Sequence, residues 1–82
     1  VTLGVIPSYG SEVEGLEIDG ARADGPGGKA GLKKGDIIIE IGGKDIKNIY
    51  DYMYRLGELN PGQNINIKVR RGDIIIDLKV NL

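Results

Sequence analysis

The residue types that most often carry out catalysis are missing from this sequence. The 82-residue chain contains no cysteine and no histidine, which removes thiolate nucleophiles, imidazole bases and every common set of zinc ligands. Carboxylates remain, and Glu12, Glu14 and Glu17 lie close together in the sequence. A carboxylate pair that works as acid and base needs an apolar pocket, and a charged run without one is typical of a solvated face. The sequence therefore predicts no catalytic residue, no metal site and no cofactor.

A glycine-rich segment at residues 25–30 has the spacing of a nucleotide-binding motif. Its pattern, G-x-G-x-x-A, would let a pyrophosphate approach the start of a helix. Such a site requires a long crossover helix, whereas Gly31 and Gly35 interrupt any helix here after about one turn. The lysine of the motif is also followed by alanine, where a phosphate-binding loop has serine or threonine. We therefore interpret the segment as a turn.

The composition indicates one small globular domain. Hydrophobic residues make up 40% of the chain and charged residues 28%, which are ordinary proportions for a folded domain. The net charge of -1 lacks the basic excess that nucleic-acid binding requires, and the apolar runs are too short for membrane insertion. We expect a single domain over residues 1–82, monomeric as a fragment, and excised from a larger protein because Val1 lies inside a predicted strand.

Short strands separated by glycine-rich turns account for most of the pattern. The expected elements are a strand over 2–6 that Pro7 ends, a strand over 15–19, one helical turn over 29–32, strands over 36–41 and 44–46, and two strands over 65–69 and 74–82. The last two are joined through Arg71-Gly72-Asp73. We interpret this tripeptide as a tight hairpin turn rather than an adhesion motif, since glycine between alternating strands permits such a turn.

The strand over 36–41 is expected to be the most buried. Its residues are β-branched and nearly all apolar, which is typical of a strand covered on both faces. Glu40 is expected to face solvent. Either the odd-numbered isoleucines of this strand or their even-numbered neighbour should share one core with apolar residues from other elements. The odd-numbered set is Ile37, Ile39 and Ile41, the neighbour is Ile38, and the partners are Leu32, Ile67 and Val69.

One helix is predicted, over residues 48–59. Asn48 is a favourable N-cap, and the sequence Asn60-Pro61-Gly62 ends the segment. Apolar residues repeat at helical spacing along one face: Ile49, Tyr52, Met53, Leu56 and Leu59. Tyr50 and Tyr54 flank Met53 and could form an aromatic shelf for a ligand or pack at the rim of the core. Together these elements predict a mainly β, α+β fold, a small and partly open barrel or sandwich of five to six strands with one long and one short helix.

The central part of the sequence resembles the signature of PDZ domains. That signature is a Pro-x-x-x-Ala-Gly-Leu turn, a Gly-Asp-x-Ile strand entry and a glycine hairpin, and here it reads Pro26, Ala30-Gly31-Leu32, Gly35-Asp36 with Ile38, and Gly42-Gly43. The order of elements resembles the circularly permuted PDZ domains of bacterial envelope proteases. Segments 4–9, 15–18 and 46–53 are similar to the PDZ modules appended to secreted bacterial zinc aminopeptidases. The resemblance implies an accessory module, not an enzyme by itself, located in the periplasm or secreted.

The resemblance also implies a peptide-binding function. A peptide or protein C-terminus would add as a strand in a groove between strand 2–6 and helix 48–59, with its carboxylate held by backbone N–H groups around Leu3, Gly4 and Val5. The residues implied in ligand binding are Thr2, Leu3, Gly4, Val5, Ile6, Ile49, Tyr52, Met53 and Leu56. Pro7 has no N–H group, which disfavours pairing with a long peptide. The alternative is a docking or autoregulatory domain that positions the parent peptidase or its substrate, with the groove filled by a segment of the parent chain or left empty.

Overall fold

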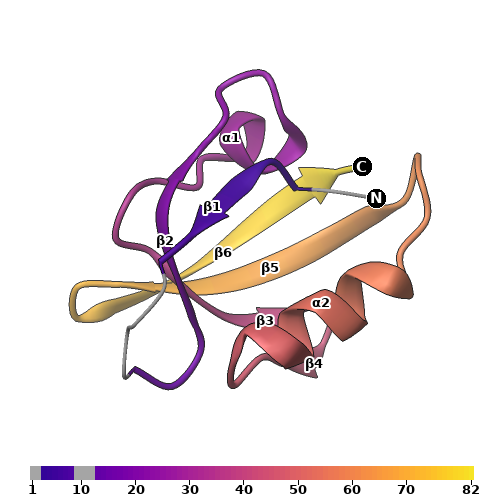
Figure 1. The fold of residues 1–82 in the computed structure, drawn as a ribbon. Helices are drawn as coiled ribbons and strands as arrows, with labels where there is room; N and C mark the ends of the chain where they lie inside the picture. The colour runs from indigo at the N-terminus through magenta and orange to yellow at the C-terminus, as the bar shows by residue number, and fades with distance from the viewer. Residues whose placement is uncertain (1–2, 9–12) are drawn as a thin grey trace.

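The chain folds into an antiparallel sheet with two helices (Figure 1). A computed structural model describes residues 3–8 and 13–82. Over these residues the elements are β1 (Val5–Pro7), β2 (Leu16–Ala21), α1 (Pro26–Ala30), β3 (Ile37–Ile41), β4 (Lys44–Asp45), α2 (Ile49–Gly57), β5 (Asn64–Arg71) and β6 (Ile74–Asn81). Six strands with one longer and one shorter helix confirm the predicted mainly β fold.

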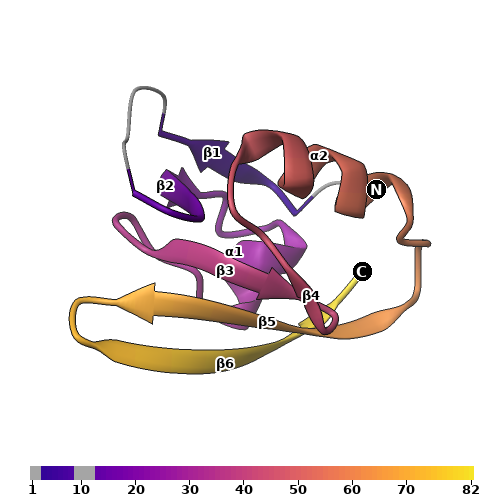
Figure 2. The same ribbon diagram turned by 90° about the horizontal axis from the view of Figure 1, so that it is seen from below.

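The sheet has the strand order β1-β2-β3-β5-β6, with β4 paired to β3. The longest ladder joins β5 to β6, and its turn is closed by Arg71 opposite Ile74. Gly72 lies in this turn with a φ of 62°, a left-handed conformation that glycine adopts without strain, so the predicted hairpin is confirmed. Figure 2 shows β1 and α2 on the same side of the β5–β6 hairpin, with β3 between them and that hairpin.

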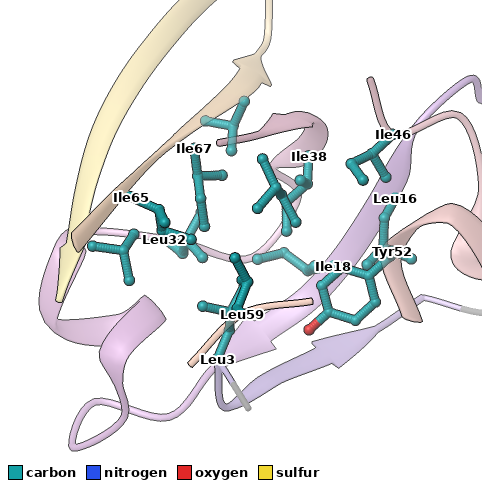
Figure 3. Packing of buried hydrophobic residues seen from close by; sticks show 13 residues of the cluster. Leu3, Leu16, Ile18, Leu32, Ile38, Ile46, Tyr52, Leu59, Ile65 and Ile67 are labelled. Atoms are coloured by element: carbon teal, nitrogen blue, oxygen red, sulfur yellow. The ribbon is translucent and has the colours of Figure 1, made fainter. Parts of the chain in front are cut away.

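One hydrophobic core joins all the larger elements (Figure 3). Leu3, Ile18, Ile38 and Ile67 are fully buried, and Tyr52 of α2 packs into the same cluster. Burying a side chain of this size contributes about 1.5–3 kcal/mol to folding. The predicted contributions of Leu32, Ile67 and Val69 to this core are confirmed.

The strand β3 does not keep the simple alternation expected from its sequence. Its pairing with β5 shifts register between Ile38 and Glu40, so that Ile38 and Ile41 are both fully buried, while Ile37 and Ile39 are half-buried. A bulge of this kind inserts one residue and changes the face on which the following side chains lie. Glu40, which was expected to face solvent, is half-buried: its side chain is 27% exposed and lies 3.5 Å from the Lys68 ammonium group.

The helix α2 begins where the sequence predicts. The Asn48 side chain accepts a hydrogen bond from the Asp51 amide at 2.9 Å, which satisfies one of the free N–H groups at the helix start. The helix ends at Gly57, two residues before the predicted end. Leu59 lies beyond it and is still buried, so the apolar repeat continues into the loop and makes the helix look longer in the sequence.

The helix α1 begins at Pro26, three residues before the predicted helical turn. Gly31 ends it with a φ of 107°, and its N–H group donates to the Gly28 carbonyl, as expected for a left-handed C-cap. A β-carbon at Gly28 would collide with the Arg22 carbonyl. The second glycine of the Pro-Gly-Gly sequence is therefore required by close backbone packing, although it is a poor helix former.

Candidate functional site

The strand β1 forms one edge of the sheet and contains a proline. It pairs with β2 alone, and Pro7 is its last residue. The sequence predicted that Pro7 ends the strand before it, which is wrong. Proline is tolerated at a sheet edge when its nitrogen faces away from the neighbouring strand. The directions of the backbone groups in β1 therefore determine what its open edge can bind.

The hydrogen bonds at the two ends of β1 determine these directions. The Arg22 amide donates to the Gly4 carbonyl at 2.8 Å, and in a planar trans peptide the N–H group of the next residue points the opposite way. The Val5 N–H group therefore points away from β2. In the same way, the Ser8 amide donates to the Glu17 carbonyl at 2.8 Å, so the Pro7 carbonyl points away from β2. Along residues 5–7, the open edge therefore presents the Val5 N–H group as a donor. At Pro7 it presents only the carbonyl, which is an acceptor, because proline has no N–H group.

The segment before β1 is held by α1. The Gly27 amide donates to the Leu3 carbonyl at 2.9 Å, and a β-carbon at Gly27 would lie 2.8 Å from that oxygen. Gly4 follows with a φ of 71°, which lets the chain change direction before β1 begins. In the sequence, Gly27 cannot be told apart from the neighbouring turn glycines; the close approach of the Leu3 carbonyl shows why glycine is needed there.

The position of α2 is set by Arg55, which sequence reasoning missed. Its Nε donates to the Ile41 carbonyl at 3.1 Å and its Nη2 to the Gly42 carbonyl at 3.3 Å. These bonds fasten one flank of the helix to the β3–β4 turn. Residues in a helix are separated by about 100°, so Met53 lies about 160° around the axis from Arg55. Met53 is therefore on the opposite flank, away from the β3–β4 turn.

The core-facing side of α2 is set by Tyr52. Its side chain is 6% exposed, and burial raises the pKa of the Tyr52 hydroxyl to about 12. Its ring belongs to the same core cluster as Ile18 of β2 (Figure 3). Tyr52 thus holds the helix against the sheet on one side while Arg55 holds it on another.

The residues proposed from sequence as ligand contacts differ in exposure. Leu3 and Tyr52 are buried in the core, whereas Ile6 and Met53 are 55% and 61% exposed. The others are half-buried: Gly4, Val5, Ile49 and Leu56. Thr2 lies outside the described residues. The structure therefore distinguishes apolar helix residues that the sequence could not tell apart. Tyr52 lies within the core, Ile49 and Leu56 lie at its margin, and Met53 is exposed to solvent.

Two other groups of residues singled out in the sequence lie largely at the surface where the structure describes them. Tyr50 and Tyr54 are 77% and 76% exposed, so the rim-packing alternative is wrong for both rings. Glu14 is exposed and Glu17 is half-buried, while Glu12 lies outside the described residues. These side chains give no enclosed environment for acid–base chemistry.

A hollow elsewhere on the surface is polar, and Arg55, one of its two cationic residues, already has hydrogen-bond partners. It is lined by Gly42, Gly43, Arg55, Gln63, Asn64, Ile65, Asn66, Lys79 and Asn81 and has a volume of about 690 Å³. The guanidinium of Arg55 in this hollow is bonded to two backbone carbonyls and to Glu58. The hollow lies on the Arg55 flank of α2, away from Met53, and we do not assign ligand binding to it.

The proteins similar to this chain include proteases and an aminopeptidase N family protein. A protein from Rhizobium meliloti described as a probable periplasmic serine endoprotease DegP-like is 33% identical over 72 residues, which cover 87% of this chain and 14% of that protein. The solved structure of the HtrA-type protease AlgW with decapeptide superposes with a TM-score of 0.86 at 27% identity, covering 98% of this chain and 28% of that one. An aminopeptidase N family protein from Idiomarina loihiensis superposes with a TM-score of 0.85 at 26% identity, covering 99% of this chain and 13% of that one.

These comparisons change the class of peptidase expected among the relatives of this chain. The curated relatives are described as serine endoproteases, whereas the sequence predicted modules of zinc aminopeptidases. The chain spans about one seventh of the curated relative's length. Across the described residues, the helices are too short or too polar to cross a membrane. The sequence model of the PDZ domain matches residues 7–82, and the chain belongs to the PDZ domain family.

Proposed function

We propose that this chain is a peptide-binding accessory module of a peptidase. A peptide C-terminus adds as a strand to the open edge of β1, opposite α2. The observation that carries this proposal is the outward direction of the Val5 N–H group on an edge strand that lies on the same side of the β5–β6 hairpin as α2. An exposed edge of this kind offers main-chain hydrogen bonds to an extended ligand.

The carboxylate of the ligand binds to backbone N–H groups around Leu3, Gly4 and Val5. The left-handed Gly4 and the bond from Gly27 to the Leu3 carbonyl support this, because they fix the curvature of the segment before a ligand arrives. Preorganised N–H groups in a curved segment attract anions. The last ligand side chain lies against half-buried apolar groups of Val5, Ile49 and Leu56, with Met53 at the outer margin. Tyr52 and Leu3 support these contacts from the core, and Thr2 and Ile6 complete the proposed set.

A comparison of free and amidated peptides tests this function. The probes are acetylated heptapeptides that end in a free Ala, Val, Leu, Ile, Phe, Glu or Lys, each with its amidated counterpart. We expect the best apolar peptide to bind with a dissociation constant in the micromolar range, about -7 to -8 kcal/mol. Amidation removes charge-assisted hydrogen bonds and costs about 1.5–3 kcal/mol. The assay includes a chain extended upstream of Val1, because strand ends fray.

Equal affinity for free and amidated peptides would overturn carboxylate capture. The module would then be a docking or autoregulatory domain that binds a segment of its parent chain or positions a substrate. Sedimentation of the free module checks the further proposal that it is a monomer.

The parent is proposed to be a peptidase that acts in the periplasm or after secretion. The curated relatives are described as periplasmic serine endoproteases, and one solved neighbour is an aminopeptidase N family protein. A zinc-dependent aminopeptidase parent is the finer proposal, supported by the resemblance of segments 4–9 and 46–53. Inhibition of the complete parent by a metal chelator is expected, and inhibition by a serine-directed reagent instead would assign it to the other class.

A further inference from the structure

We propose that Pro7 restricts recognition to the last two residues of the ligand and its carboxylate. This inference rests on the proposed function, and it adds the length of peptide that the module reads. It follows from the backbone directions in β1 and from the missing N–H group of proline. The substrate class is accordingly a short free C-terminus, with little dependence on the sequence upstream.

The position of the missing donor follows from antiparallel pairing. If the Val5 N–H group binds the ligand carboxylate, the Val5 carbonyl lies opposite the N–H group of the last ligand residue. Backbone groups that face one edge recur every second residue. The next outward position on β1 is therefore Pro7, which lies opposite the third residue from the ligand C-terminus.

Pro7 can complete only half of that pair. Its carbonyl points outward, because the Ser8 N–H group of the same peptide unit donates to Glu17. The carbonyl of the third-from-last ligand residue would need a donor from residue 7, and proline has none. That carbonyl remains with water, so the third-from-last ligand residue keeps only the hydrogen bond from its N–H group to the Pro7 carbonyl, and residues upstream of it gain little from strand pairing.

The same geometry shows that Pro7 can be replaced without breaking the sheet. Its nitrogen lies on the side of β1 away from β2, and the neighbouring bonds from Arg22 to Gly4 and from Ser8 to Glu17 do not involve it. Pro7→Ala should therefore fold and add one donor to the open edge. Ile6→Ala is the control for the dependence on peptide length, because it shortens an exposed side chain on the same strand and adds no donor. Since Ile6 belongs to the proposed ligand-binding set, its substitution should change affinity by the same factor at every peptide length.

Nested peptides test the proposed limit. The tightest free heptapeptide of the set above is shortened to five, four, three and two residues, each with a free amino group in place of the acetyl group, because an acetyl carbonyl would replace the carbonyl of the residue removed. Each peptide is titrated against the module and both variants. For the unchanged module, the dissociation constant should vary less than about 3-fold over the series. In Pro7→Ala, affinity should rise by about 3- to 10-fold between two and three residues, as one added hydrogen bond predicts, whereas Ile6→Ala should show no such step.

A modified ligand gives the same information without changing the protein. An ester in place of the amide that follows the third-from-last residue weakens that carbonyl as an acceptor. The unchanged module should bind this depsipeptide within about 2-fold of the parent peptide, and Pro7→Ala should lose most of its gain. A step above 10-fold in the unchanged module, or no step in folded Pro7→Ala, would overturn the proposed limit while leaving peptide binding intact. If none of the free peptides binds, the proposed function itself fails, and this inference fails with it.

Discussion

Arg71 of β5 binds both carboxylate oxygens of Asp36, with Nε 2.8 Å from Oδ1 and Nη2 2.7 Å from Oδ2. Nη2 also donates to the Gly31 carbonyl at 2.9 Å, and the Lys33 amide donates to Asp36 Oδ2 at 2.9 Å. Asp36 is 1% exposed. This two-point ion pair fixes the loop between α1 and β3 against the C-terminal end of β5. The same loop holds β2, because the Gly35 amide donates to the Ile18 carbonyl.

Replacing Asp36 should lower the stability of the domain. Asp36→Asn keeps the size of the side chain but removes its charge and one acceptor, and we expect a loss of about 1–3 kcal/mol in the free energy of unfolding. Urea unfolding at pH 7 measures it. Asp77→Asn is the control, because Asp77 is an exposed residue on β6, and equal effects of the two substitutions would contradict the proposed role of the ion pair.

The ion pair between Asp36 and Arg71 also predicts that the stability of the domain depends on pH in the acid range. Burial alone would raise the pKa of Asp36, but hydrogen bonds from Arg71 and the Lys33 amide outweigh it and lower the pKa below its ordinary value of 3.8. A lowered pKa means that the carboxylate stabilises the fold fully above the unfolded-state value. This contribution is lost as the pH falls below about 4 and through the lowered pKa. The difference in stability between the unchanged protein and Asp36→Asn should therefore shrink in acid, and a constant difference would contradict this assignment.

Two glycines allow backbone strain to be tested without a change in packing. A β-carbon at Gly35 or at Gly57 would meet nothing within 4 Å. Gly35 has a φ of 91°, whereas Gly57 is the last residue of α2 and does not have a positive φ. Gly35→Val should destabilise the domain by about 1–3 kcal/mol through strain, while Gly57→Ala should stabilise it by about 0.4–1 kcal/mol. Thermal unfolding gives both signs, and an unchanged melting temperature for Gly35→Val would contradict the turn geometry.

Local signals made much of the fold predictable. Asn48 as a cap, the glycine turns and the alternation in β5 and β6 act between residues that are close in sequence, so their effects can be seen in the sequence itself. The bulge in β3 could not be predicted, since alternation gives no warning of an extra residue between Ile38 and Glu40.

The contacts that position the site were harder to predict from the sequence. Arg55 reaches Ile41 across 14 residues and Arg71 reaches Asp36 across 35. A single sequence does not indicate which charged residue will find a distant partner. The direction of the Pro7 nitrogen likewise depends on which strand pairs with β1, which only the fold supplies. For the same reason, the sequence named the apolar residues of the helix but could not separate core from surface.

Tyr52 predicts a loss of stability in alkali. Burial raises the pKa of its hydroxyl from 10 to about 12. The folded state then keeps a proton that the unfolded state loses, so this contribution to stability is full below pH 10 and is lost as the pH rises toward 12. The loss should reach about 2–3 kcal/mol. Tyr52→Phe removes it, so urea unfolding at several pH values above 9 should give a shallower decline for this variant, with Tyr54→Phe as the exposed control.

A negative charge at Met53 should weaken peptide binding without affecting the fold. Met53 is 61% exposed and lies on the flank of α2 opposite Arg55, the flank that the proposed function assigns to the ligand. A carboxylate there would repel the ligand carboxylate, and Met53→Glu should raise the dissociation constant of the best free heptapeptide by about 5- to 30-fold at low salt. Added salt should reduce this effect because exposed charges are screened. Tyr54→Glu places the same charge on the outward face of the same helix, where the ring is 76% exposed, and should change binding by less than about 2-fold. Both variants should keep the melting temperature of the unchanged module, and equal losses of affinity in the two would place the ligand elsewhere than beside Met53.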